Sequence, residues 1–152
     1  MADLLSAADR LPGFLHEQAG APFVFGESDC SMFLANWVRR LKGVDPAGEL
    51  RGAYGDEAGW RALVDAAGGL DVLVGRIAAV SALPAIAPAA ACEGDIGVVA
   101  IPALDLTAGA ICVRNGRPRP DLADGLSTAW VTKLHRGLTR LRCRPLAAWS
   151  LA

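Results

Sequence analysis

The chain has 152 residues, of which 53% are hydrophobic and 20% charged, and its formal net charge is −1. These values are typical of a globular protein, and we expect one domain over residues 1–152. The longest apolar stretch, 77–91, is interrupted by a serine and two prolines, and the N-terminus lacks a basic-then-apolar signal. We therefore predict no membrane span and synthesis in the cytoplasm.

Two short helices are expected at the N-terminus, over 3–10 and 13–18. Pro12 separates them, because proline can begin a helix but breaks the interior of one. The sequence thus predicts a helix-turn-helix pair at the start of the fold.

The next helix is predicted to begin at Cys30, after a short extended stretch over 21–26. Its apolar residues recur at the spacing of one helical face, which directs the thiol inward; they are Cys30, Phe33, Leu34, Trp37, Val38 and Leu41. Ser28 or Asp29 can cap the start of this helix, and Gly43 supplies a left-handed stop.

Cys30 is the candidate nucleophile. Backbone N–H groups and the positive end of the helix dipole favour its thiolate, whereas the carboxylates of Glu27 and Asp29 oppose it. The net direction of the pKa shift stays open. The alternative is that Cys30 is a small buried apolar residue under a capping turn.

The chain changes from helices to strands at its middle. Helices are expected over 56–67 and 70–80, and a proline-alanine connector follows. Runs typical of strands come next, at 95–101, 110–114, 127–134 and 141–150. This order predicts an α+β fold in which an antiparallel sheet packs on the early helices, with the Cys30 helix at the centre.

The cysteines do not form a metal-binding pattern. They are far apart, without a Cys-x-x-Cys pair, and only two histidines accompany them; they are Cys30, Cys92, Cys112 and Cys143. We predict four free thiols, no metal and no cofactor.

Charge is distributed unevenly. Residues 1–100 carry seven basic and thirteen acidic side chains, whereas 101–152 carry eight and three. The basic residues of the last third are Arg114, Arg117, Arg119, Lys133, Arg136, Arg140, Arg142 and Arg144. They form either a face for an acidic partner or a solvated strand face. The segment carries no recognised nucleic-acid motif, so no nucleic-acid partner is predicted.

Six short motifs occur in order: Phe25–Cys30, Trp37, Gly43–Pro46, Arg51–Tyr54, Gly94-Asp95 and Trp149. An Asp-Cys pair at a helix start and a Gly-Asp pair at a strand start resemble the NlpC/P60 group of papain-like peptidases. The ordered set is similar to a DUF6950-like domain of unknown function, found among phage and prophage tail genes. The resemblance implies a papain-like NlpC/P60-type fold, with Cys30 as nucleophile and with structural or groove roles for Asp29, Trp37, Gly94 and Asp95.

In those peptidases a histidine on the strand after Gly-Asp takes the thiol proton. Aligning that strand with 108–113 places Ala108 at the position of the base, and a methyl group cannot accept a proton. His135 can serve as the base only if the sheet order brings the end of its strand over the Cys30 helix. The alternative for His135 is a surface imidazole beside Lys133 and Arg136.

Other polar and aromatic residues have simpler interpretations. His16 is expected to be exposed, and Asp95 is expected to hold the Gly-Asp turn rather than act as an acid. The tryptophans are core candidates, although one of them could line a groove, because indole stacks on sugars and peptides; they are Trp37, Trp60, Trp130 and Trp149.

The resemblance implies a tail-tip protein with a degenerate catalytic site, made in the bacterial cytoplasm and carried in the virion or a prophage-derived particle. Its partners would be other tail proteins and, through the old groove, a peptidoglycan peptide. The alternative is an active cysteine peptidase or amidase that cleaves peptidoglycan stem peptides during genome delivery. A third hypothesis is a host-encoded binding module unrelated to phage.

Overall fold

The computed structural model describes residues 6–115 and 128–151. Within these ranges the helices are α1 (Ala7–Gly20), α2 (Cys30–Lys42), α3 (Glu57–Ala67) and α4 (Leu70–Val80), with 3₁₀ turns η1 (Pro88–Ala90) and η2 (Pro102–Leu104). The strands are β1 (Ala85–Ile86), β2 (Ile96–Ile101), β3 (Leu106–Asn115), β4 (Thr128–Leu134), β5 (Gly137–Arg142) and β6 (Ala147–Trp149). None of these helices has the length and hydrophobicity needed to cross a membrane.

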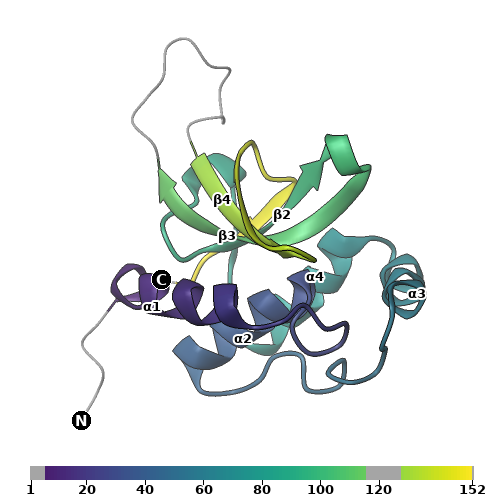
Figure 1. Cartoon of the computed structure of the whole chain (residues 1–152). Helices are drawn as coiled ribbons and strands as arrows, with labels where there is room; N and C mark the ends of the chain where they lie inside the picture. Colours follow the sequence, from purple (N-terminus) through teal and green to yellow (C-terminus); the bar gives the residue numbers. More distant parts are fainter. Residues whose placement is uncertain (1–5, 116–127, 152) are drawn as a thin grey trace.

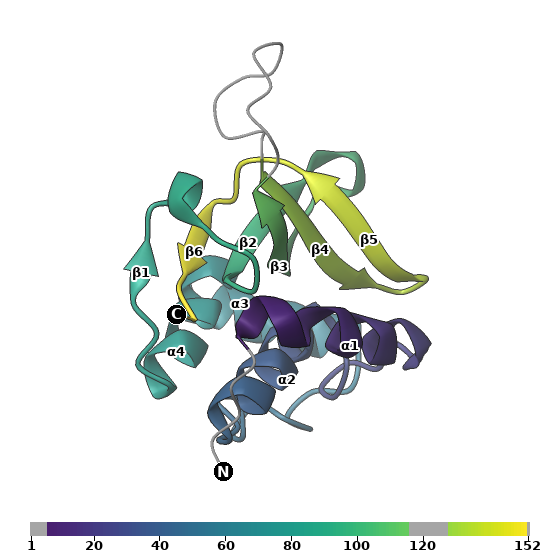
Figure 2. The same cartoon turned by 90° about the vertical axis from the view of Figure 1, so that its left-hand side faces the viewer.

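The described strands form one antiparallel sheet in the order β1-β6-β2-β3-β4-β5 (Figure 2). Helices α1 and α2 lie along one face of this sheet (Figure 1). Helix α2 packs against β3 and β4, while α1 reaches β5 and α4 reaches β2. The predicted α+β fold, with an antiparallel sheet on the N-terminal helices, is confirmed.

Helix α2 begins and ends where the sequence predicts. Asp29 is its N-cap, and Gly43 ends it with a left-handed backbone at φ 80°. Its inward face has no exposed surface at Phe33, Leu34 and Trp37, which pack into the core under the sheet. The central position of the Cys30 helix therefore follows from its apolar stripe.

Helix α1 contradicts the prediction of two short helices. It is continuous from Ala7 to Gly20 with Pro12 inside it. Ser6 and Asp9 form a capping box at its start, and Leu11 and Phe14 are buried in the core. Pro12 itself is exposed. The cap and the buried face offset the one backbone hydrogen bond that proline cannot donate.

The predicted strand over 141–150 is also wrong. Strand β5 ends at Arg142, and β6 begins at Ala147 beside β2, several strands away in the sheet. Pro145 is buried between them, and the N–H of Leu146 donates to Val98 O at 2.7 Å. The chain therefore crosses the end of the sheet at the point where a single strand was expected.

The register of β2 and β3 fixes which side chains face the helices. Val98 pairs with Gly109 and Val99 with Ala108. Paired residues of antiparallel strands point to the same face, and neighbours along a strand point to opposite faces. Val98 belongs to the core between sheet and helices, so Gly109 faces α2. Ala108 shares the other face with Val99.

Candidate functional site

The carboxylate of Asp29 organises the turn that leads into Cys30. Asp29 has no exposed surface. Its Oδ1 accepts from the backbone N–H groups of Ser31 at 2.9 Å and Met32 at 3.0 Å. Its Oδ2 accepts from the N–H of Gly26 at 2.8 Å and from Tyr54 Oη at 2.6 Å. Four donors therefore hold this side chain, which fixes the start of α2.

Two neighbours depend on this arrangement. Burial, together with the charge of Asp29, raises the pKa of Tyr54 far above its ordinary value, so its hydroxyl remains a donor. Gly26 has a left-handed backbone at φ 85°, and a Cβ there would lie 2.3 Å from the carbonyl oxygen of Tyr54. Only glycine fits this close approach without moving backbone.

The Gly94-Asp95 corner is a second fully bonded polar element. Trp37 Nε1 donates to the carbonyl oxygen of Gly94 at 2.8 Å. The carboxylate of Asp95 accepts from the backbone N–H groups of Cys92 at 2.8 Å and Leu151 at 3.0 Å. These contacts tie the start of β2 to α2 and to the C-terminal segment. They give Asp95 a turn-holding role.

The thiol of Cys30 is buried and neutral. Only 7% of Cys30 is exposed. Burial raises its pKa to about 11, although a backbone hydrogen bond at Gly109 acts in the opposite direction. The negative charge of Asp29 adds to the increase. At neutral pH the Cys30 thiol therefore keeps its proton.

A small pocket of about 50 Å³ lies over Cys30, and His135 is part of its wall. The sheet order thus brings the end of β4 to the Cys30 helix, which the sequence could not decide. His135 is exposed, and its ring lies 4.2 Å from that of Phe23 and 5.7 Å from that of Phe25. Aromatic contacts, rather than a hydrogen bond to an orienting carboxylate, hold the imidazole within the described structure. His16 is exposed on α1 and lines no part of this pocket.

Two residues of β3, Thr107 and Ala108, lie beside Cys30. A Cβ on Gly109 would lie 2.7 Å from the carbonyl oxygen of Cys30, so Gly109 faces α2 at close range. Thr107 precedes Gly109 by two residues and shares this face, whereas Ala108 points to the other face. Both line the pocket. Ala108 belongs to the same buried cluster as Cys30, and neither Thr107 nor Ala108 is a histidine.

Lys133 is also not where the charge pattern predicts. It was expected on a basic surface, but it has no exposed surface. Its Nζ donates to the carbonyl oxygen of Gln18 at 3.1 Å, in the last turn of α1, which has no basic residue of its own. Burial lowers the pKa of Lys133. Arg136, Arg140, Arg142 and Arg144 are exposed, whereas the side chains of Arg114, Arg117 and Arg119 lie outside what the structure describes.

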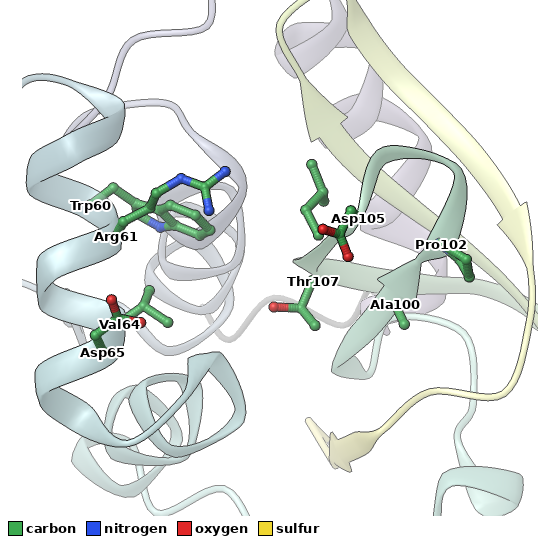
Figure 3. Close-up of a pocket in the computed structure, with 9 residues that line it drawn as sticks. Trp60, Arg61, Val64, Asp65, Ala100, Pro102, Asp105 and Thr107 are labelled. Atoms are coloured by element: carbon green, nitrogen blue, oxygen red, sulfur yellow. The ribbon is translucent and has the colours of Figure 1, made fainter.

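A larger cleft of about 380 Å³ adjoins the Cys30 pocket. It lies between α3 and the segment that joins β2 to β3 (Figure 3). Trp60, Leu106 and Thr107 line both spaces, so the two lie side by side. Trp60 Nε1 donates to Ser31 Oγ at 3.2 Å, which fixes the indole at the junction. Trp60 is thus the tryptophan that lines a groove, which no local signal in its helix distinguishes from a core position.

Within the described part of the chain, the cysteines and acidic residues do not assemble a metal centre. All four cysteines are free thiols. Across residues 6–115 and 128–151, no three histidine, cysteine or carboxylate side chains are grouped as ligands for one ion.

The DUF6950 family, known as a domain of unknown function, matches residues 5–137. The chain belongs to this family. The match confirms the family-level resemblance inferred from the ordered motifs, and it includes His135 but not Trp149. Nothing in it links the family to phage tails or to NlpC/P60 peptidases. Comparison with curated proteins and with solved structures finds no match.

Proposed function

We propose that this DUF6950 protein is a non-catalytic component of a phage or prophage tail tip, built on a scaffold related to NlpC/P60 peptidases. In this proposal the groove beside Cys30 binds a ligand and does not cleave it. The observation that carries the proposal is the buried Cys30 thiol, whose pKa is raised to about 11, with Thr107 and Ala108 rather than a histidine beside it on β3.

A cysteine nucleophile needs either a lowered thiol pKa or an adjacent base that takes the proton. Cys30 has a raised pKa, and the hydroxyl of Thr107 is not a base at neutral pH. The turns at Asp29 and Asp95 are nevertheless fixed, because donors occupy the oxygens of both carboxylates. Fixed turns of this kind can hold the shape of a binding groove without any reaction at the thiol.

The tail-tip setting rests on the ordered motifs and on the charge distribution. Arg136, beside the outer strand β5, and Arg140, within it, are exposed, and residues 1–100 have an excess of acidic side chains. Surfaces of opposite charge on neighbouring subunits favour contacts between them.

Antibody labelling of particles from a lysate of the encoding phage or induced prophage tests this setting. We expect label at the tail tip in electron micrographs and the protein in purified particles. Its absence from particles, with the protein present in the same lysate, would contradict the tail assignment.

An active cysteine peptidase or amidase is the second candidate, because His135 lines the same pocket as Cys30. Digestion of purified peptidoglycan stem peptides separates the two functions. We expect no cleavage by the wild-type protein beyond that of Cys30→Ala. Cleavage that Cys30→Ala and His135→Ala both abolish would establish the hydrolase and reject the non-catalytic role.

A further inference from the structure

The cleft beside the Cys30 pocket has walls from two distant parts of the chain. Helix α3 supplies one wall, and the other comes from η2, Asp105 and the start of β3. Figure 3 shows Trp60 directed toward this space from α3, and Thr107 and Asp105 directed toward it from the opposite side. At about 380 Å³ the cleft has room for a side chain or a small organic ligand.

The indole of Trp60 forms an aromatic surface at the inner end of the cleft. Its ring is partly exposed, and the hydrogen bond to Ser31 Oγ holds its orientation. The face of an indole carries negative electrostatic potential and attracts cations within about 6 Å of its centre. A rigid ring at the junction of a polar cleft and an apolar pocket therefore favours a ligand that is both apolar and positively charged.

The charges of the walls point to the same class of ligand independently of the aromatic ring. Asp65 projects from α3 and Asp105 from the opposite wall. In the described part of the chain neither carboxylate has an ion-pair partner. Arg61 also lines the cleft, but Glu57 accepts two hydrogen bonds from it, at 3.2 Å and 2.9 Å, and so offsets its charge.

We propose that this cleft binds its ligand through a cationic group, an ammonium or a guanidinium, held between Asp65 and Asp105 and against the face of Trp60. The inference rests on the proposed binding function of the groove and specifies the chemistry of what it binds. The apolar pocket over Cys30 accommodates a small uncharged part of the same ligand.

Nuclear magnetic resonance titration tests this proposal with two matched probes, N-acetyl-lysine methylamide and the uncharged N-acetyl-norleucine methylamide. The indole N–H groups of the four tryptophans give separate signals, and a Trp60→Phe variant assigns the one from the cleft. We expect the lysine probe to shift the Trp60 signal and to bind several-fold more tightly than the norleucine probe. The other three indole signals serve as internal controls.

Removing the carboxylates should remove this preference. Asp65→Asn and Asp105→Asn should each weaken the lysine probe about two- to fivefold, which is the range for exposed ion pairs. The double variant should bind both probes equally, whereas Asp71→Asn, an exposed change on α4 outside the cleft, should have no effect.

The outcomes separate this inference from the proposed function. Equal binding of both probes to the wild-type protein would overturn the cationic preference and leave the groove as a binding site. A Trp60 signal that neither probe shifts would overturn both the cationic preference and the binding role of the cleft.

Discussion

The Asp29 turn and the Cys30 pocket are adjacent in the chain but differ in how completely their polar groups are bonded. Asp29 has four donors on its carboxylate, whereas the Cys30 thiol is buried beside Thr107 and Ala108. The hydrogen bonds of Asp29 are thus complete, whereas none of the β3 residues that line the Cys30 pocket is a base. An Asp-Cys pair at a helix start can therefore be explained by folding alone.

The largest expected effect is on the Asp29 side of this comparison. Asp29→Ala removes an N-cap and leaves the Gly26 N–H and the Tyr54 hydroxyl without their buried acceptor. Together these losses should lower the free energy of unfolding by about 3–5 kcal/mol. Asp56→Ala, which removes an exposed cap of α3, should cost about 1 kcal/mol in the same urea titration. Equal losses would show that the buried hydrogen bonds add nothing.

A substitution at Gly109 tests the close contact between β3 and the start of α2. Gly109→Ala places a methyl group 2.7 Å from the Cys30 carbonyl oxygen and 2.8 Å from Leu34 Cδ1. We expect a loss of about 3 kcal/mol in unfolding free energy, because backbone must move. Gly13→Ala, in α1 with no atom within 4 Å of the new methyl, should instead stabilise the protein by about 0.5–1 kcal/mol. A neutral Gly109→Ala would contradict the contact.

Alkaline pH should weaken the fold through Cys30. Its pKa is 9.0 when unperturbed and about 11 in the fold, so between these values the folded state retains a proton that the unfolded chain releases. Stability is therefore complete below pH 9 and falls toward pH 11, by about 2–3 kcal/mol in total. Tyr54, whose pKa is also raised, adds to the loss at higher pH.

Urea titrations across this pH range provide the check. Cys30→Ala should lose less stability between neutral and alkaline pH than the wild-type protein. A variant curve parallel to the wild-type curve would show that the thiol does not carry the effect.

The smallest predicted effect concerns the base position itself. Thr107→His places an imidazole on the face that meets Cys30, whereas Ala108→His places it on the other face. A neighbouring imidazolium favours the thiolate, so Thr107→His should raise the rate of Cys30 alkylation at neutral pH about tenfold. Ala108→His, whose side chain points to the other face of β3, should raise the rate less. A larger increase for Ala108→His would show that position 108 is the one that meets the thiol.

The elements that sequence analysis located correctly are those with local signals. Helix α2 has a cap, an apolar stripe and a glycine stop, so its bounds follow from its own residues. The continuous α1 could not be predicted, because buried contacts of Leu11 and Phe14 outweigh the cost of Pro12. The break between β5 and β6 likewise depends on which strand the chain joins after Pro145.

The residues of the candidate site also divide into those with a local sequence signal and those placed by the packing of distant segments. Cys30 and Asp29 were found from their position at a helix start, but the proximity of His135 depends on the sheet order. Which side chains of β3 face α2 depends on a register that the close packing of Gly109 on α2 fixes. Lys133 reads as a surface charge in sequence, and its burial requires the end of α1 beside β4.

The most direct test of the central claim is the pH dependence of Cys30 alkylation by iodoacetamide, in a variant carrying Cys92→Ser, Cys112→Ala and Cys143→Ala. We expect the folded protein to react appreciably only above about pH 10, and His135→Ala to leave the profile unchanged. The urea-unfolded chain should react with a midpoint near the unperturbed thiol pKa of 9.0. Rapid reaction of the folded protein below neutral pH that is lost on His135→Ala would contradict the account, because it would demonstrate a working Cys30–His135 pair.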